Sequence, residues 1–222
     1  MADYINNNIL CQAYVHVEPD CITDELVNNL KLHLNEFVKS RAEFFLYPNA
    51  DIDIELKDGS IKVYATILGT VSMLFAGVSQ YPEFREGAIL MYEDVKRLSD
   101  YIATESIFST RAKHNQVIRI EARTGVIGSI KKIVNLLDLV RSNNGVVFAD
   151  TLASRLNQAA TDTQKLLGNL KSKEDEILIK TGINQIINEL PRNPKAPKRR
   201  TNSKEQIELY NSAITYIKEI VK

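Results

Sequence analysis

The sequence is poor in the residues from which disulfide frameworks and metal sites are built. Its 222 residues include two cysteines, Cys11 and Cys21, and three histidines. Two thiols do not make a disulfide framework, and the histidines do not complete a common zinc-binding pattern with them. We therefore expect both thiols to be reduced and structural, and we expect no metal and no cofactor.

Catalytic signatures are also missing. The chain has no lysine-bearing phosphate loop, no dinucleotide fingerprint and no Gly-x-Ser-x-Gly elbow. His16, His33 and His114 have no serine or cysteine partner placed by a recognisable motif. We assign no catalytic residue. Whether the protein is an enzyme stays open, and the missing motifs favour a protein without catalytic activity.

The first twenty residues lack the features of an export signal. Acids and asparagines stand where such a signal needs a basic start followed by an apolar stretch. We therefore expect a cytoplasmic protein.

The net charge of zero hides an uneven distribution of charged residues. Apolar and charged fractions of 44% and 25% are those of an ordinary globular protein. Residues 1–110 nevertheless carry 17 acids and 8 bases, whereas residues 111–222 carry 11 acids and 20 bases. An acidic and a basic lobe attract each other, a second copy of the chain, or an anionic partner of the basic half.

A hairpin is the clearest local signal. Asp58-Gly59 is a two-residue turn of the kind that closes a hairpin, here over residues 51–68. Placing this turn at the tip pairs Leu56 with Ile61, Ile54 with Val63, Ile52 with Ala65 and Glu55 with Lys62. Residues 9–17 add a strand, and residues 116–123 a further short strand. The expected fold class is therefore α+β, with a small antiparallel sheet (hairpin 51–68 plus the N-terminal strand) packed by helices and followed by a helical C-terminal extension.

Helical periodicity marks six segments. Thr23 is an N-cap for the first, which is expected to bury Leu26, Leu30, Leu34 and Phe37. The segments cover about residues 23–40, 84–108, 129–142, 149–170, 175–190 and 204–222. The expected organisation is an α+β domain over residues 1–144, a helical extension over 145–190, a basic proline-rich linker over 191–203 and a C-terminal amphipathic helix over 204–222.

Three segments admit a second interpretation. Ala149, Leu152, Leu156, Ala159, Thr163, Leu166 and Leu170 keep a heptad spacing, but the small members favour close packing on the parent protein over a coiled coil. The uncharged run from Val63 to Pro82 approaches the length of a membrane span, yet its start belongs to the hairpin, so a buried core helix is favoured. Glu55-Leu56-Lys57 has the acid-x-lysine spacing of some nucleases, but alternating charges are typical of any solvated sheet face.

The best candidate for a ligand site is the turn Gly125-Val126-Ile127-Gly128-Ser129, where two glycines open a helix. Bare amides at a helix N-terminus bind phosphate or carboxylate, and basic residues flank this turn. The candidate anion-binding site consists of Arg119, Arg123, Gly125, Gly128, Ser129, Lys131 and Lys132. The alternative is a tight strand-to-helix turn whose small residues permit close packing.

The basic linker and the last helix are the other features that bear on binding. The stretch from 192 to 204 contains six bases and no acid, namely Arg192, Lys195, Lys198, Arg199, Arg200 and Lys204. Its prolines predict an extended, solvated and mobile segment. The final helix, capped by Ser203 and Gln206, has an apolar face that must be buried on its own domain or on a partner. This partner-helix face is formed by Ile207, Tyr210, Ile214, Ile217 and Val221.

These features favour a non-catalytic interaction or regulatory subunit of a cytoplasmic, bacterial-type multi-protein assembly, with a protein partner or self-association. One alternative is binding of nucleic acid or another polyanion by the basic C-terminal half, although aromatic interleaving that would support base stacking is missing. The other is a small effector of a bacterial defence or toxin system acting on membrane or nucleic acid. Embedding in a membrane is not expected.

Overall fold

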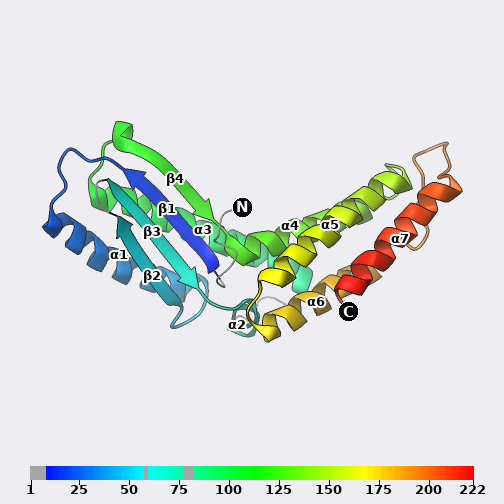
Figure 1. The fold of residues 1–222 in the computed structure, drawn as a ribbon, viewed down its shortest axis with the longest axis horizontal. Helices are drawn as coiled ribbons and strands as arrows, with labels where there is room; N and C mark the ends of the chain where they lie inside the picture. The colour runs from blue at the N-terminus through cyan, green and yellow to red at the C-terminus, as the bar shows by residue number, and fades with distance from the viewer. Residues whose placement is uncertain (1–8, 58–59, 78–82) are drawn as a thin grey trace. The chain divides into compact units, whose positions relative to one another are not determined.

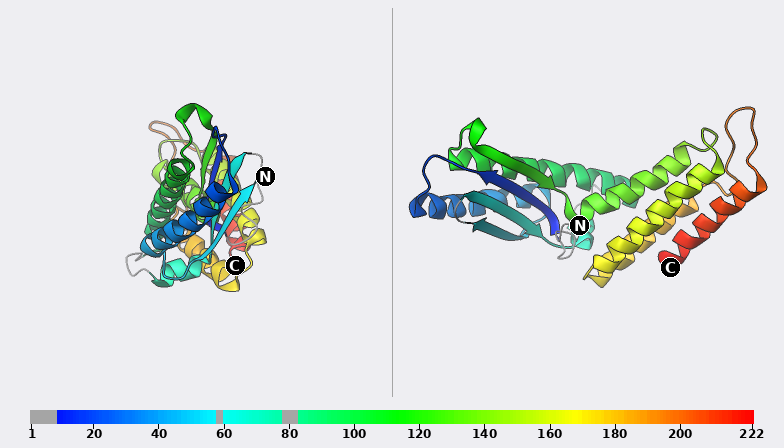
Figure 2. Two further views of the ribbon diagram at one scale, coloured as in Figure 1. Left: turned by 90° about the vertical axis from the view of Figure 1, so that its left-hand side faces the viewer. Right: turned by 45° about the horizontal axis from the view of Figure 1, so that its top comes forward.

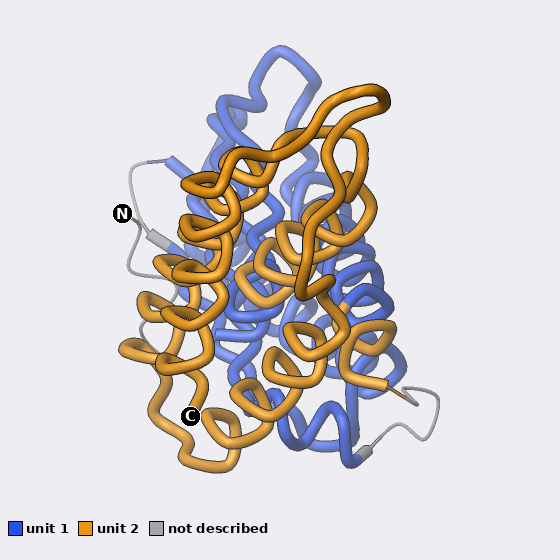
Figure 3. The backbone as a smooth tube through the Cα atoms, turned by 90° about the vertical axis from the view of Figure 1, so that its right-hand side faces the viewer, with its two compact units in different colours: residues 1–82, 89–128 blue, residues 83–88, 129–222 orange. Residues whose placement is uncertain are grey.

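The computed structural model describes residues 9–57, 60–77 and 83–222, which form two compact units (Figures 1 and 3). Unit 1 contains residues 1–82 and 89–128, and unit 2 contains residues 83–88 and 129–222. The expected domain boundary at residue 144 stays a prediction, because compactness alone does not show which segment folds independently.

Unit 1 is built on a four-stranded antiparallel sheet with strand order β2-β3-β1-β4. The two long helices α1 and α3 lie on the same face of this sheet (Figures 1 and 2). The chain order β1-α1-β2-β3-α3-β4 is that of the split βαβ, or ferredoxin-like, motif. The elements are β1 (Ile9–Val17), α1 (Asp24–Phe45), β2 (Asp51–Lys57), β3 (Ile61–Leu68), α2 (Val71–Gly77), α3 (Phe84–Thr110), the 3-10 turn η2 (His114–Gln116) and β4 (Val117–Arg123). The expected α+β class is confirmed.

The core of unit 1 lies between the sheet and this helix layer. Alternate residues of β1 face the helices, and Cys11, Ala13 and Val15 are at most 1% exposed. Burial raises the pKa of the Cys11 thiol to about 12, with a smaller opposing effect of the Ser99 hydroxyl on α3. The expected structural role therefore fits Cys11, whereas Cys21 is a free and exposed thiol.

Helix α1 begins as expected but buries a different stripe. The Thr23 hydroxyl accepts a hydrogen bond from the Leu26 amide at 3.2 Å, which caps the first turn. The buried residues are spaced four apart: Leu30, Leu34, Val38 and Ala42. Leu26 and Phe37, which were expected to be buried, are only half-buried. A four-residue spacing drifts slowly around a helix of 3.6 residues per turn, so Val38 takes the inward position next to Phe37.

The predicted hairpin forms, but its register differs by two residues. Leu56 lies opposite Val63 and Ile54 opposite Ala65, where the prediction had Ile61 and Val63. A shift of two residues keeps every side chain on its own face, so matching apolar to apolar positions does not distinguish the two registers. Asp58 and Gly59, on which the prediction rested, lie outside the described residues.

The apolar run from Val63 to Pro82 is divided between two short elements. Its first part completes β3, and its middle forms the seven-residue helix α2, in which Val71 and Leu74 are buried. Residues 78–82 lie outside the described part of the chain. Across the described ranges, no helix combines the length and the low polarity that crossing a bilayer would require.

Unit 2 is helical. Helix α5 carries the heptad seam, whose residues Leu152, Leu156, Ala159 and Thr163 are fully buried. The most extensive helix contact among the described residues joins α5 to α7, as small side chains on a seam allow. The helices that complete the unit are α4 (Gly125–Ser142), which begins in unit 1, α5 (Ala149–Asn169), α6 (Lys173–Asn188) and α7 (Lys204–Ile220).

The linker before α7 is fixed by side-chain hydrogen bonds. Asn202 accepts a bond from the Ala149 amide at 3.1 Å and donates one to the Pro194 carbonyl at 2.8 Å. The Lys195 amide donates to Asn144 Oδ1 at 2.7 Å, and Pro194 is buried. The segment is therefore docked on its own unit, unlike the mobile linker that its proline and charge content predicted.

We expect Asn202→Ala to weaken this docking, because the Ala149 amide and the Pro194 carbonyl each lose a partner. The free energy of unfolding should fall by about 1–3 kcal/mol, the usual cost of leaving polar groups unpaired. Chemical denaturation and hydrogen exchange at the Ala149 amide measure the change. Asn202→Asp keeps the acceptor for Ala149, so it should retain that amide's protection; equal loss in both variants would contradict the assignment.

Candidate functional site

The glycine turn of the candidate anion-binding site is used for close packing. Gly125 has φ +47°, and a Cβ atom there would lie 2.0 Å from the Ile9 carbonyl oxygen. At Gly128 a Cβ would lie 2.2 Å from the Thr124 hydroxyl. The intervening Val126 and Ile127 are buried. Gly125 therefore rests against the backbone of β1, and Gly128 leaves room for the Thr124 side chain that precedes the helix.

The arginines of this candidate site are neutralised on the polar face of the sheet. Arg119 and Arg123 both form ion pairs with Glu121, which lies between them on β4. Arg123 also donates through Nη1 to Gln12 Oε1 at 2.6 Å, and Gln12 donates to the Thr66 hydroxyl at 2.8 Å. Desolvation opposes ionisation of Glu121, but the hydrogen bonds and charges of Arg123 and Arg119 outweigh it and lower the pKa of this carboxyl.

Two tyrosines in contact, with their ring planes tilted by 43°, lie beside these arginines. The rings of Tyr14 on β1 and Tyr64 on β3 are 4.7 Å apart between centroids. The guanidinium carbons of Arg123 and Arg119 lie 5.4 and 5.9 Å from the centroid of the Tyr14 ring. Desolvation and the neighbouring Tyr64 hydroxyl raise the pKa of Tyr14, which is 7% exposed. Tyr14 is thus covered by side chains, whereas Tyr64 is half-buried.

The remaining members of the candidate site belong to unit 2. Lys132 Nζ lies 2.8 Å from Asp162 Oδ2 on α5. Ser129 and Lys131 also have interactions within the chain. The predicted cluster is therefore divided between two local networks, and the charged members of both are engaged.

The bases of the linker are presented to solvent. Arg192, Lys195, Lys198, Arg199 and Arg200 are exposed, and within the described chain no ion pair involves any of these five. A turn closed by a hydrogen bond from the Arg200 amide to the Pro197 carbonyl at 3.0 Å displays three of them, with Arg199 at φ +63°. Lys204 is paired loosely with Glu208, at 3.8 Å. The Arg200 guanidinium carbon lies 5.8 Å from the centroid of the Phe148 ring. The anchored loop thus holds five exposed cations in the nine residues 192–200; we call it the basic loop.

The partner-helix face of α7 is buried within unit 2. Tyr210 and Ile217 are fully buried and Val221 is 5% exposed, while Ile207 and Ile214 are half-buried. The Tyr210 hydroxyl donates to the Pro191 carbonyl at 2.8 Å, and burial raises its pKa to about 12. With α7 docked in this way, its apolar face is satisfied by its own chain.

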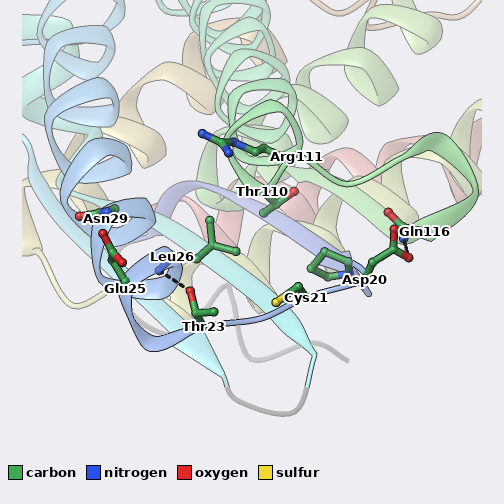
Figure 4. Close-up of a pocket in the computed structure, with 10 residues that line it drawn as sticks. Asp20, Cys21, Thr23, Glu25, Leu26, Asn29, Thr110, Arg111 and Gln116 are labelled. Atoms are coloured by element: carbon green, nitrogen blue, oxygen red, sulfur yellow. Dashed lines mark hydrogen bonds between the residues drawn. The ribbon is translucent and has the colours of Figure 1, made fainter.

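A pocket of about 440 Å³ opens between the start of α1 and the end of α3 (Figure 4). Asp20 on its wall is bound by Lys113 at 2.9 Å and Gln116 at 2.6 Å, bonds that lower the pKa of this carboxyl. The free thiol of Cys21 lines it, but no histidine is among the described residues of the lining. Nor do the described residues contain three metal-ligating side chains grouped for an ion. No reaction is specified by these groups.

A cluster of exposed aromatic residues on the helix layer was not anticipated from the sequence. Phe44 on α1 is 77% exposed and Tyr101 on α3 is 53% exposed. Phe45 joins them, with ring centroids 5.0 Å from Phe44 and 5.8 Å from Tyr101. The Arg41 guanidinium carbon lies 5.3 Å from the Phe37 ring centroid and 5.9 Å from that of Tyr101. We call these five residues the aromatic surface.

A hydrogen bond between α1 and α3 lies next to Phe37 of the aromatic surface. His33 Nε2 lies 2.7 Å from Glu105 Oε1, and the Ser109 hydroxyl donates to the same oxygen at 3.0 Å. The bond from His33 is the main cause of the lowered pKa of the Glu105 carboxyl. Phe37, Arg41 and Phe44 recur at spacings of four and three, a second stripe on α1 that periodicity detects, although it does not tell which stripe is buried.

Comparison of the chain with protein-family models, curated proteins and solved structures finds no match.

We expect Gly125→Ala to destabilise the protein, since a methyl group there meets the Ile9 carbonyl and the positive φ is unfavourable. The loss in free energy of unfolding should be about 2 kcal/mol or more. Denaturation by urea measures it. Gly168→Ala on α5 is the matched control, because a Cβ there has no neighbour within 4 Å. It should leave stability unchanged or raise it by up to about 1 kcal/mol, and equal effects at both positions would refute the packing role.

Proposed function

We propose that this protein is a non-catalytic interaction subunit of a cytoplasmic multi-protein assembly, and that it binds a protein partner through the aromatic surface. The observation that carries the proposal is the exposure of Phe44 and Tyr101 around a positioned arginine. Large contiguous apolar patches on a protein surface commonly mark sites that bind another protein.

The composition of the aromatic surface supports a protein partner. Aromatic residues and arginine are enriched where protein interfaces hold most of their binding energy. Full burial of one phenylalanine side chain contributes about 1.5–3 kcal/mol, so Phe44 and its neighbours supply enough for a specific contact. Arg41 is already held over Phe37 and Tyr101, which reduces the entropy lost on binding.

The aromatic surface also replaces the original reason for expecting a partner. That expectation rested on the apolar face of α7, which is buried within unit 2. The proposal therefore moves the contact from the last helix to α1 and α3 of unit 1.

Phe44→Ala combined with Tyr101→Ala should abolish partner capture while leaving the fold intact, because both side chains are largely exposed. Affinity purification with quantitative mass spectrometry should show specific partners depleted at least about tenfold, as expected when interface residues of this type are truncated. Circular dichroism and the melting temperature check the fold.

The matched control is Ile177→Ala with Leu209→Ala, which removes two apolar side chains of unit 2 that are 57% and 56% exposed. This variant should retain every partner. Equal partner recovery by the aromatic-surface variant and the native chain would refute the proposal.

A second candidate function, binding of a polyanion, is favoured by the basic loop. Its cations are exposed and form no ion pair among the described residues, although Arg200 lies over the Phe148 ring. The loop is fixed by the hydrogen bond from Asn202 to the Pro194 carbonyl. A fixed set of cations binds phosphates with less loss of conformational freedom than a mobile tail. This function would reside in unit 2, apart from the aromatic surface. The effector hypothesis stays a prediction.

Lys198→Gln, Arg199→Gln and Arg200→Gln together should remove most binding to labelled single-stranded RNA or DNA at low salt. The slope of log Kd against log salt should fall by about two, since each phosphate contact to a single strand contributes about 0.7. Fluorescence anisotropy at several salt concentrations measures both effects. The control replaces exposed Lys31, Lys39 and Lys96 of unit 1 by Gln, the same change in net charge. An equal loss of binding in both variants, or binding that does not depend on salt, would exclude the basic loop as the binding site.

A further inference from the structure

Strand β4 forms an edge of the described sheet. It pairs with β1 on one side, and the strand order β2-β3-β1-β4 places no described strand on the other. An unpaired edge presents a row of backbone donors and acceptors that another strand can bind. Proteins commonly block such edges with proline, bulges or charges that point into the core. The described β4 has no proline, and its arginines are neutralised by Glu121. Its pairing with β1 shifts register between Arg119 and Val117, and this shift leaves Ile118 without a partner on β1.

The apolar side of β4 is left uncovered by the helix layer. Ile120 lies opposite Val15 of β1 and Ala122 opposite Ala13, so these residues share the face that packs on α1 and α3. Val15 is fully buried, but Ile120 is 51% exposed. Ile118, two residues before it, is 55% exposed. The core face of the sheet thus continues past the helices that cover it.

We propose that β4 binds a second copy of itself, antiparallel and centred on Ile120, to form a continuous eight-stranded sheet across a two-fold axis. In this register Ile120 faces Ile120 of the second copy, Ile118 faces Ala122, and Arg119 faces Glu121. Apolar residues meet on one face, as stable cross-strand pairs require. On the other face Arg119 meets Glu121 at the centre, and Val117 meets Arg123 at the ends. A two-fold contact of this kind is self-complementary and closes at two chains.

Neighbouring registers are less complementary. Centring on Glu121 places two glutamates together and sets Arg119 against Arg123, while centring on Arg119 places two arginines together. A shift by an odd number of residues brings Ile120 onto the charged face of the partner. Only the Ile120 register avoids like charges and keeps the apolar face continuous. The charge pattern of β4 therefore favours β4 of a second copy as the strand that binds this edge.

The proposal does not rest on the aromatic surface, and the two are separable by mutation. Sedimentation equilibrium over a wide concentration range should show a reversible dimer for the native chain. Ile120→Lys should weaken it at least about tenfold, because it places two ammonium groups at the axis. Ile177→Lys, at a position 57% exposed in unit 2, should leave the dimer unchanged. So should the Phe44→Ala, Tyr101→Ala variant that tests the proposed function.

A charge exchange and a cross-link test the register. Glu121→Arg should dissociate the dimer, and adding Arg119→Glu should restore it, because the exchanged charges again face each other. In a Cys21→Ser background, Ile120→Cys should form a disulfide-linked dimer on mild oxidation, whereas Ile177→Cys should not. A native chain monomeric at about 100 μM, far above the Kd of a specific dimer, would overturn the proposal. So would a dimer insensitive to Ile120→Lys, or no cross-link through residue 120.

Discussion

The pairing of β1 with strands on both sides is the constraint on which unit 1 depends. β1 joins β3 and β4, and its inward residues Ala13 and Val15 are covered by the helix layer. Its first carbonyl, at Ile9, lies so close to Gly125 that no other residue fits there without strain. The positions of β4 and of the start of α4 both follow from this strand, and hence so does the exposure of the β4 edge.

Charge pairing decides which of the basic residues can bind a ligand. A count of arginines and lysines treats Arg123 and Arg199 as equivalent, yet one is held by Glu121 and Gln12 and the other is displayed on a fixed turn. An anion that approached Arg123 would have to displace a carboxylate that is already desolvated. An anion that binds the basic loop displaces no carboxylate, so less free energy is lost on binding there.

The sequence predicted the elements better than the contacts between them. Composition located β1 closely, and helical periodicity located α3 and α4, because both are local properties of the chain. It did not fix the hairpin register, since two-residue shifts preserve the faces, nor the docking of the linker, which depends on the amides of Asn144 and Asn202. Composition alone marks these asparagines as ordinary loop residues.

The candidate sites were also predicted well where they depend on local sequence and poorly where they depend on tertiary contacts. The Gly125 turn was found from sequence because glycines and bases are conspicuous there, but its role in packing depends on the β1 backbone, which is remote in sequence. The aromatic surface was missed because α1 carries two apolar stripes, and only the position of the sheet determines which one faces inward. Exposure is a property of the tertiary structure, so a sequence pattern cannot assign it to Phe44 in advance.

The distance along the chain between β1 and β4 has a consequence for synthesis on the ribosome. Gln12 and Arg123 are hydrogen-bonded although 111 residues separate them. One edge of β1 therefore waits unpaired until the segment after η2 has left the exit tunnel. At a synthesis rate of roughly 5–20 residues per second, that interval lasts several seconds. The nascent chain exposes a strand edge throughout this time, and an exposed edge can pair with a strand of another chain.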